Sequence, residues 1–195
     1  MKNTVKKIIC RMLLAAVKIL EILCVKINAF GKFYCQVFYQ KMIDKESEIA
    51  GITPDMKILH IGSGPFPMTA LCLVQNGHWV EAVDNSEEIV RISLEVVAKF
   101  GLGDRIMIRQ ADGLEVDCNE FDVVWVSLHI FPKDKVLLHS LNTLKDGGKV
   151  VYRNPRGLLA RIYPNLQPLQ IAPNCEYQKV KVSFGKEIIM IKNLS

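Results

Sequence analysis

The sequence contains no residue pattern typical of a metal site or a disulfide framework. The cysteines form no C-x-x-C pair, and several lie inside apolar runs, where cysteine usually packs as a small core residue. The four histidines show no metal-ligand spacing. We therefore predict a reducing, cytoplasmic location and no bound metal. The six cysteines are Cys10, Cys24, Cys35, Cys72, Cys118 and Cys175.

Long apolar runs are also missing. The hydrophobic N-terminal part is interrupted by Arg11, Lys18, Glu21 and Lys26, so no span approaches the roughly 20 residues that a membrane-crossing helix needs. The longest charge-free run there, Met12–Val17, is too short for the apolar region of a signal peptide. We expect neither a transmembrane helix nor a signal peptide.

Positive charge is concentrated at one end of the chain. Residues 1–45 contain nine Lys or Arg and only two acidic residues, although the whole chain of 195 residues carries a formal net charge of just +5. A basic amphipathic segment can touch an anionic membrane or a nucleic acid, but a solvated helix face has the same pattern. We favour the solvated face, keep membrane-surface contact as the alternative, and predict no nucleic-acid partner.

The first part of the chain has a helical pattern. Apolar residues recur at three- and four-residue spacing over residues 5–27, which predicts one long amphipathic helix. A second helix is predicted over residues 32–50, ending near Gly51 and Pro54. We expect residues 1–54 to form a small helical cap and residues 55–195 to form the core domain.

Strands and helices alternate after residue 56. Short connections between them predict a parallel sheet covered by helices on both faces. At the C-terminal end, two strand-like segments flank Gly185 and predict an antiparallel hairpin. This order indicates an α/β, Rossmann-like domain of the class I S-adenosylmethionine-dependent transferases. The predicted strands are "KILHI", "HWVEAV", "RIMIRQ", "FDVVWVS", "GKVVYR", "EYQKVKVSF" and "KEIIMIKN", and the predicted helices cover 67–76, 86–100 and 133–144.

The loop after the first predicted strand, "GSGPFP", is a candidate ligand-binding loop. In such a sheet the ligand lies beyond the carboxyl ends of the strands, where the strand order reverses. Gly62 and Gly64 allow the backbone to approach a ligand closely, and Ser63 and Pro65 belong to the same loop. Pro67 suits the first turn of the helix that follows. The exposed N–H groups at that helix start favour a carboxylate.

Polar residues follow the next three predicted strands. Asp84, about 20 residues beyond the glycines, suits the two ribose hydroxyls of an adenosyl group. It could instead cap the next helix, although Ser86 can fill that role. The chain has no G-x-x-x-x-G-K phosphate loop, and an NAD site is disfavoured because the third glycine is missing. The remaining candidates for an S-adenosylmethionine pocket are Asn85, Asp112, Gly113 and Ser127, with Asp112 facing the adenine amine.

Two segments together point to a family. "GSGPFPMTA" resembles the G-[SG]-G-P-L-P-L-T loop of the nicotianamine synthase family, particularly its shorter archaeal and bacterial members. "VVYRNPRGLLARIY" is similar to the family segment I-I-Y-R-x-x-x-G-x-R-x-x-x-Y, and the resemblance extends from about Tyr39 to Tyr163. It implies transfer of the 3-amino-3-carboxypropyl group of S-adenosylmethionine to an amine or amino acid, release of methylthioadenosine, and a role in metallophore biosynthesis. Only about 50 residues precede the core domain, fewer than in archaeal and plant relatives, so a single transfer to an amino acid and successive transfers are both left open.

The resemblance also implies a catalytic glutamate just before the first strand. Counting back from the glycine loop places Glu46 at that position and Glu48 two residues away, on a different helix face. We predict Glu46 as the general base that deprotonates the acceptor amine. Tyr39 lies two helical turns earlier on nearly the same face, and Arg153 suits a bidentate hold on a substrate carboxylate, so both are predicted substrate-binding residues.

Two positions differ from ordinary methyltransferases of this fold. His60 replaces an acidic residue and Phe66 replaces a third glycine, so we expect a stiffer wall against the methionine end of the co-substrate. Such a wall would expose the γ-carbon instead of the methyl carbon, because positioning decides which carbon of the sulfonium reacts. The alternatives are a small-molecule methyltransferase and a non-catalytic protein that binds a membrane surface through its basic helix.

Overall fold

A computed structural model describes residues 33, 39–157, 159–182 and 185–193. The predicted helix over residues 5–27, and residues 32 and 34–38 of the second predicted helix, lie outside the described residues. The helices are α3 (Gln40–Ala50), α4 (Met68–Gln75), α5 (Glu87–Phe100), α6 (Lys133–Thr143) and α7 (Pro168–Ile171), with a 3-10 turn at Leu159–Arg161. The strands are β1 (Lys57–Ile61), β2 (Trp79–Asp84), β3 (Ile106–Gln110), β4 (Val123–Val126), β5 (Lys149–Pro155), β6 (Glu176–Val182) and β7 (Lys186–Lys192).

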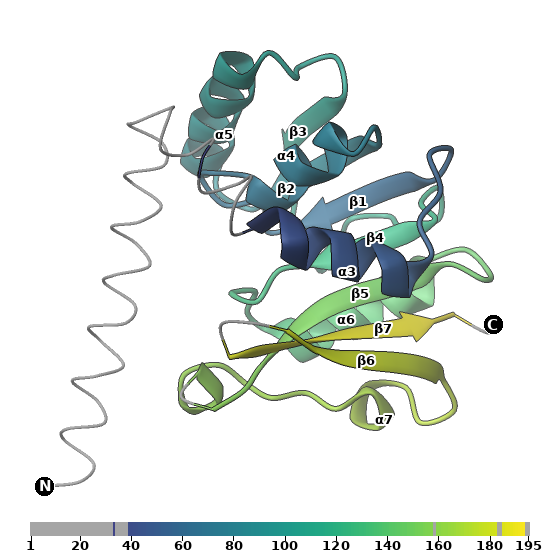
Figure 1. The fold of residues 1–195 in the computed structure, drawn as a ribbon. Coiled ribbons are helices and arrows are strands. Elements are labelled where there is room, and N and C mark those ends of the chain that lie inside the picture. The colour runs from purple at the N-terminus through teal and green to yellow at the C-terminus, as the bar shows by residue number, and fades with distance from the viewer. Residues whose placement is uncertain (1–32, 34–38, 158, 183–184, 194–195) are drawn as a thin grey trace, which may run out of the picture.

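The strands form one sheet in the order β3-β2-β1-β4-β5-β7-β6 (Figure 1). β1 to β5 pair in parallel, and β7 pairs antiparallel with both β5 and β6. This confirms the predicted Rossmann-like sheet with its terminal hairpin. The chain runs outward from β1 to β3 and then returns to β4, so the strand order reverses between β1 and β4. Ligands of such sheets bind at the carboxyl ends of the strands at that point.

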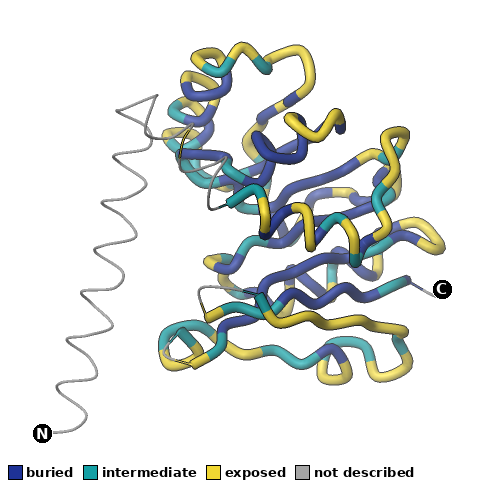
Figure 2. Tube along the Cα trace, viewed as in Figure 1, coloured by how far each residue is buried: buried dark blue, intermediate teal, exposed yellow. Residues whose placement is uncertain are grey.

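Each face of the sheet has its own apolar core. One core lies under α3, α4 and α5 and contains Trp125, and the other lies under α6 and contains Tyr152. The central strands are buried almost throughout, whereas β6 at the sheet edge is largely exposed (Figure 2). Burial on both faces explains why β4 is a continuous apolar run in the sequence.

Local sequence signals account for the helix ends. Ser86 caps α5 by accepting a hydrogen bond from the backbone N–H of Ile89, and Gly101 ends it in the left-handed conformation. Gly51 ends α3 in the same way, as predicted. Pro67 precedes α4 as its N-cap, so the prediction that it lies in the first turn was wrong by one position. Within the described residues, no helix combines the length and apolar character that spanning a membrane requires.

Candidate active site

The glycine loop leaves β1 with both glycines at positive φ. Gly62 has φ +81° and Gly64 has φ +67°, a region that other residues rarely adopt. The backbone N–H groups of Gly62 and Ser63 donate to the carbonyl of Val83, which ties the loop to β2. A Cβ on Gly62 would lie 2.3 Å from Cδ1 of Ile130, so the Ile130 side chain would have to move to accept one.

Asp84 lies at the end of β2 and contacts the same loop. Its Oδ2 accepts a hydrogen bond from the Gly64 N–H at 3.0 Å, and its Oδ1 accepts one from the Ser86 N–H at 3.3 Å. Ser86, and not Asp84, caps α5. Asp84 therefore holds the two loops together at the carboxyl edge and remains partly exposed there, where the adenosyl ribose was predicted.

The other predicted pocket residues lie along the same edge. Asp112 is exposed and accepts the Leu114 N–H at 2.9 Å, which shapes the turn after β3. Gly113 is buried, and a Cβ there would lie 2.8 Å from Ile61. The Asn85 carbonyl accepts from Gln110, which joins the ends of β2 and β3. Among the described residues, no group of three or more His, Cys, Asp or Glu side chains could hold a metal ion.

Phe66 does not form a wall for a ligand. Its side chain is 4% exposed and packs edge-on against Phe100 of α5, with the ring centroids 5.7 Å apart. The predicted wall was therefore wrong in this respect. The large apolar side chain gains more from the core between α4 and α5 than from a polar loop surface.

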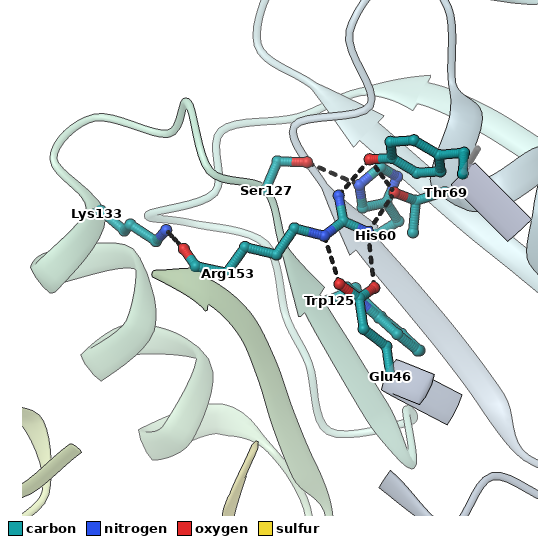
Figure 3. Close-up of polar contacts among 8 residues, drawn as sticks. Glu46, His60, Thr69, Trp125, Ser127, Lys133 and Arg153 are labelled. Carbon is teal, nitrogen blue, oxygen red and sulfur yellow. Dashed lines mark hydrogen bonds and ion pairs between the residues drawn. The ribbon is translucent and has the colours of Figure 1, made fainter. Parts of the chain in front are cut away.

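The centre of the site is a buried ion pair. Glu46 on α3 is fully buried and Arg153 on β5 is 3% exposed. The Arg153 Nε donates to Glu46 Oε1 at 2.6 Å, and its Nη2 donates to Oε2 at 2.7 Å, which makes a bidentate pair (Figure 3). The indole N–H of Trp125 donates to Oε2 at 2.9 Å. Glu46 faces the sheet, whereas Glu48 is exposed.

Two further side chains complete the hydrogen bonds of Arg153. Its Nη1 donates to the Tyr39 hydroxyl, and its Nη2 donates to Thr69 Oγ1 at 3.1 Å. Burial alone would lower the pKa of Arg153, but the Glu46 charge, the Tyr39 hydroxyl and the hydrogen bonds to Glu46 together outweigh burial and raise it. Burial also raises the pKa of Tyr39, although the Arg153 charge opposes this effect. The structure therefore brings together the three residues that were predicted to share one site, Tyr39, Glu46 and Arg153.

Arg153 differs from its prediction in one respect. It lies inside β5, which continues to Pro155, and its guanidinium fork is occupied by Glu46. A fork that already holds a buried carboxylate is not available to a substrate carboxylate in this arrangement. Arg153 instead positions Glu46.

His60 and Ser127 form a second polar contact at this edge. The His60 Nε2 lies 2.9 Å from the Ser127 hydroxyl oxygen, and its Nδ1 is buried without a hydrogen-bond partner among the described residues. Burial, assisted by the Arg153 charge, lowers the pKa of His60 to about 3. The ring is therefore neutral at pH 7, and His60 does not replace the negative charge found at this position in ordinary methyltransferases.

Sequence reasoning missed three residues of this cluster, namely Thr69, Trp125 and Lys133. Thr69 was visible as the threonine of "GPFPMT", because it matches the last residue of the family loop. No sequence pattern marked Trp125 or Lys133 as a site residue. Trp125 lies near the end of β4, and Lys133 is the first residue of α6. Lys133 is 1% exposed and donates to the Arg153 carbonyl oxygen at 2.5 Å (Figure 3).

Comparison with known proteins identifies the family of the chain. The model of the family described as nicotianamine synthase protein matches residues 26–188, most of the chain. The chain belongs to the nicotianamine synthase family. Nicotianamine synthase of Solanum lycopersicum is 30% identical over 122 residues, which cover 57% of this chain and 38% of that relative. A ubiquinone/menaquinone biosynthesis C-methyltransferase of Idiomarina loihiensis is 29% identical over 111 residues, covering 53% and 44%.

Solved structures of this nicotianamine synthase family and of methyltransferases share the fold. A mutant of MtNAS has a TM-score of 0.82 at 19% identity and covers 99% of this chain and 77% of that chain. An RNA methyltransferase from Salinibacter ruber has a TM-score of 0.63 at 18% identity, with 80% and 92% covered. The chain spans less than half of the length of the curated relatives that it matches.

Proposed function

We propose that this nicotianamine synthase family member transfers the 3-amino-3-carboxypropyl group of S-adenosylmethionine to the amine of a small, amino acid-type acceptor in metallophore biosynthesis. The observation that carries the proposal is the buried Glu46 carboxylate, held by Arg153 and Trp125 near the carboxyl edge where the strand order reverses between β1 and β4. A carboxylate at that place is suited to receive a proton from an attacking amine.

The reaction is a substitution at carbon. The acceptor amine attacks the γ-carbon next to the sulfonium, that carbon–sulfur bond breaks, its electron pair stays on sulfur, and methylthioadenosine leaves. The new carbon–nitrogen bond places a positive charge on nitrogen, so one proton must leave the product. Glu46 is the base in this scheme, and the residues around it determine whether it can act.

The hydrogen bonds of Glu46 leave room for one donor. A carboxylate offers about four acceptor positions. Arg153 and Trp125 occupy three of them, two on Oε2 and one on Oε1. The remaining position on Oε1 suits one N–H of an acceptor amine. The bidentate Arg153 fork fixes the direction of that lone pair, which is how a positioning residue contributes to catalysis.

The glycine loop fits S-adenosylmethionine as co-substrate. Gly62 and Gly64 bring the loop backbone to the carboxyl edge without side chains, and Asp84 carries a partly exposed carboxylate beside them. Support also comes from the relatives, because MtNAS has been solved with S-adenosylmethionine and with MTA and tNA. We propose the same co-substrate here, bound by the loop, by Asp84 and Asn85, and by the turn at Asp112 and Gly113.

Replacement of Glu46 by Gln tests the assignment. We expect Glu46→Gln to keep S-adenosylmethionine binding and to lose at least roughly 100-fold in turnover, the lower range for removal of a general base. Glu48→Gln is the matched control, because Glu48 lies two residues away on the exposed side of α3. Methylthioadenosine and S-adenosylhomocysteine are quantified by chromatography with a panel of amines and amino acids, at a temperature where both variants are folded.

Two results would contradict the proposal. Exclusive formation of S-adenosylhomocysteine would show methyl transfer, the activity favoured by the fold shared with methyltransferases. Near-normal methylthioadenosine formation by Glu46→Gln would support the proposed reaction but contradict the role of Glu46 as its general base.

A further inference from the structure

His60 and Ser127 form a hydrogen-bonded pair at the carboxyl edge of the sheet (Figure 3). The His60 Nε2 lies 2.9 Å from the Ser127 Oγ. His60 belongs to β1 and is 1% exposed, whereas Ser127 directly follows β4 and is half-buried. The serine hydroxyl is therefore the member of the pair that a ligand can reach.

The strand register places Ser127 between the glycine loop and the buried ion pair. Extended by one residue, the β1–β4 and β4–β5 registers make Gly62, Ser127 and Arg153 neighbours across the sheet. A Cβ on Gly62 would lie 3.4 Å from the Cβ of Ser127, and the Ser127 N–H donates to the Ile61 carbonyl at 3.1 Å. The hydroxyl therefore lies between the loop that we propose for the co-substrate and the arginine that holds Glu46.

The neutral state of His60 determines which group of the pair donates. Burial, assisted by the Arg153 charge, lowers the pKa of His60 to about 3, so the ring carries a single N–H at pH 7. Its Nδ1 is buried without a hydrogen-bond partner in the described part of the chain. Orphaned buried N–H groups are rarer than orphaned acceptors, so we assign the proton to Nε2, which donates to Ser127. The Ser127 hydroxyl then keeps its own proton for a further hydrogen bond.

The surroundings of this hydroxyl favour a negatively charged acceptor. His60 is neutral, so the pair itself carries no negative charge, and the charge that acts on the His60 ring is that of Arg153. α4 begins at Met68, shortly after the glycine loop, and the aligned peptide dipoles at its N-terminus add positive potential. A carboxylate accepts a hydrogen bond from a hydroxyl more strongly than a neutral group does.

We propose that Ser127 donates a hydrogen bond to the carboxylate of the aminocarboxypropyl arm of S-adenosylmethionine, and that His60 is the residue that positions this hydroxyl. The inference rests on the proposed function, because it names what orients the arm whose γ-carbon is attacked. Phe66 cannot orient the arm from its buried place against Phe100. An arm held at Ser127 extends from the glycine loop toward Glu46, which brings the γ-carbon to the side where the amine loses its proton.

Three ligands locate the contact on the co-substrate. S-adenosylhomocysteine carries the arm with its carboxylate and its amine, the decarboxylated analogue carries the arm with the amine alone, and methylthioadenosine carries neither group. Calorimetric titration of the unmodified protein and of Ser127→Ala gives the three Kd values. We expect Ser127→Ala to bind S-adenosylhomocysteine roughly 10- to 100-fold more weakly, the range for a hydrogen bond to a charged group. It should bind the other two ligands as the unmodified protein does.

Variants of His60 test the positioning role. His60→Met removes the ring donor and should weaken the binding of S-adenosylhomocysteine by a smaller factor than Ser127→Ala does. In the Ser127→Ala background it should have no further effect, because His60 acts through the hydroxyl. His60→Gln keeps an N–H donor near the place of Nε2 and should restore most of the affinity. A merely structural role of His60 would not depend on Ser127 in this way.

Two further variants serve as controls. Ser127→Thr keeps the hydroxyl and should retain most of the affinity for S-adenosylhomocysteine. Ser140→Ala removes a serine hydroxyl about two turns into α6, which leads away from the carboxyl edge, and should bind all three ligands like the unmodified protein. The Tm of each variant shows that it is folded at the temperature of the titration.

Each other outcome contradicts a stated role. Unchanged binding of S-adenosylhomocysteine by Ser127→Ala would overturn the inference. An equal loss for the decarboxylated analogue would assign the hydroxyl to the amine, an equal loss for methylthioadenosine would assign it to the adenosyl group, and either would overturn the carboxylate contact. A further loss when His60→Met is added to Ser127→Ala would refute the positioning role.

The same measurements separate this inference from the proposed function. The expected binding pattern, together with exclusive formation of S-adenosylhomocysteine in the product assay, would support the arm contact and refute only the proposed reaction. Methylthioadenosine formation with unchanged binding by Ser127→Ala would do the reverse. An unmodified protein that binds none of the three ligands would overturn both.

Discussion

Loss of the charge on Glu46 should destabilise the protein as well as inactivate it. Arg153 is 3% exposed and donates four hydrogen bonds, two of them to Glu46. Glu46→Gln leaves this guanidinium buried without a counter-charge, which costs about 3–5 kcal/mol of unfolding free energy. The amide N–H₂ of the glutamine introduced at position 46 would also face the N–H donors of Arg153 or Trp125. For a chain of this length the cost corresponds to a decrease in Tm of roughly 6–20 °C.

Thermal unfolding of a small set of variants tests this magnitude. Arg153→Met should be destabilised to a similar extent, because it leaves the Glu46 carboxylate buried with only the Trp125 N–H among its present partners. The double variant Glu46→Gln, Arg153→Met removes both charges and should recover more than half of either loss. Calorimetry at pH 7 gives the Tm values, with Glu48→Gln as the exposed control. A decrease below about 3 °C for Glu46→Gln, or a double variant no more stable than the singles, would refute the buried-pair argument.

Two further predictions concern other residues of the site. Asp84→Ala should raise the Kd for S-adenosylmethionine roughly 10- to 100-fold in a calorimetric titration, because it removes the proposed acceptor for the ribose hydroxyls and the anchor of the Gly64 N–H; an unchanged Kd would contradict the ribose role. The pKa of His60 is about 3 in the folded protein against 6.5 for an ordinary histidine, so the unfolded chain binds the extra proton first and stability should fall as pH drops from 6.5 toward 3. His60 contributes at most about 1.4 kcal/mol per pH unit to the slope of unfolding free energy against pH. This contribution should disappear in His60→Gln. Parallel pH profiles of Tm for the variant and the unmodified protein would contradict the prediction.

Local patterns predicted the architecture well because they act over short distances. Alternating strands and helices, the Ser86 cap and the glycine turns at Gly51 and Gly62 all depend on neighbouring residues. The ends of the predicted strands and of the helices predicted over 67–76, 86–100 and 133–144 were within about two residues of those observed, whereas α7 was not predicted. Helical periodicity indicated that only one of Glu46 and Glu48 can face the site. The choice of Glu46, made by counting back from the glycine loop in the family pattern, agrees with the structure, where Glu46 is buried and Glu48 exposed.

Partner choice inside the site was decided by tertiary structure. Arg153 and Glu46 are 107 residues apart in sequence, so no local pattern could show that one occupies the fork of the other. Phe66 lies in a loop that reads as ligand-facing, yet the fold places Phe100 beside it and buries its ring.

By itself, the sequence determined the order of strands and helices, the glycine loop and the residue types available for chemistry. Only the tertiary structure decided which of those charges neutralise each other, as Glu46 and Arg153 do. The physical reason is that electrostatic pairing depends on distance and burial in space, and both arise only when segments far apart in the chain pack together.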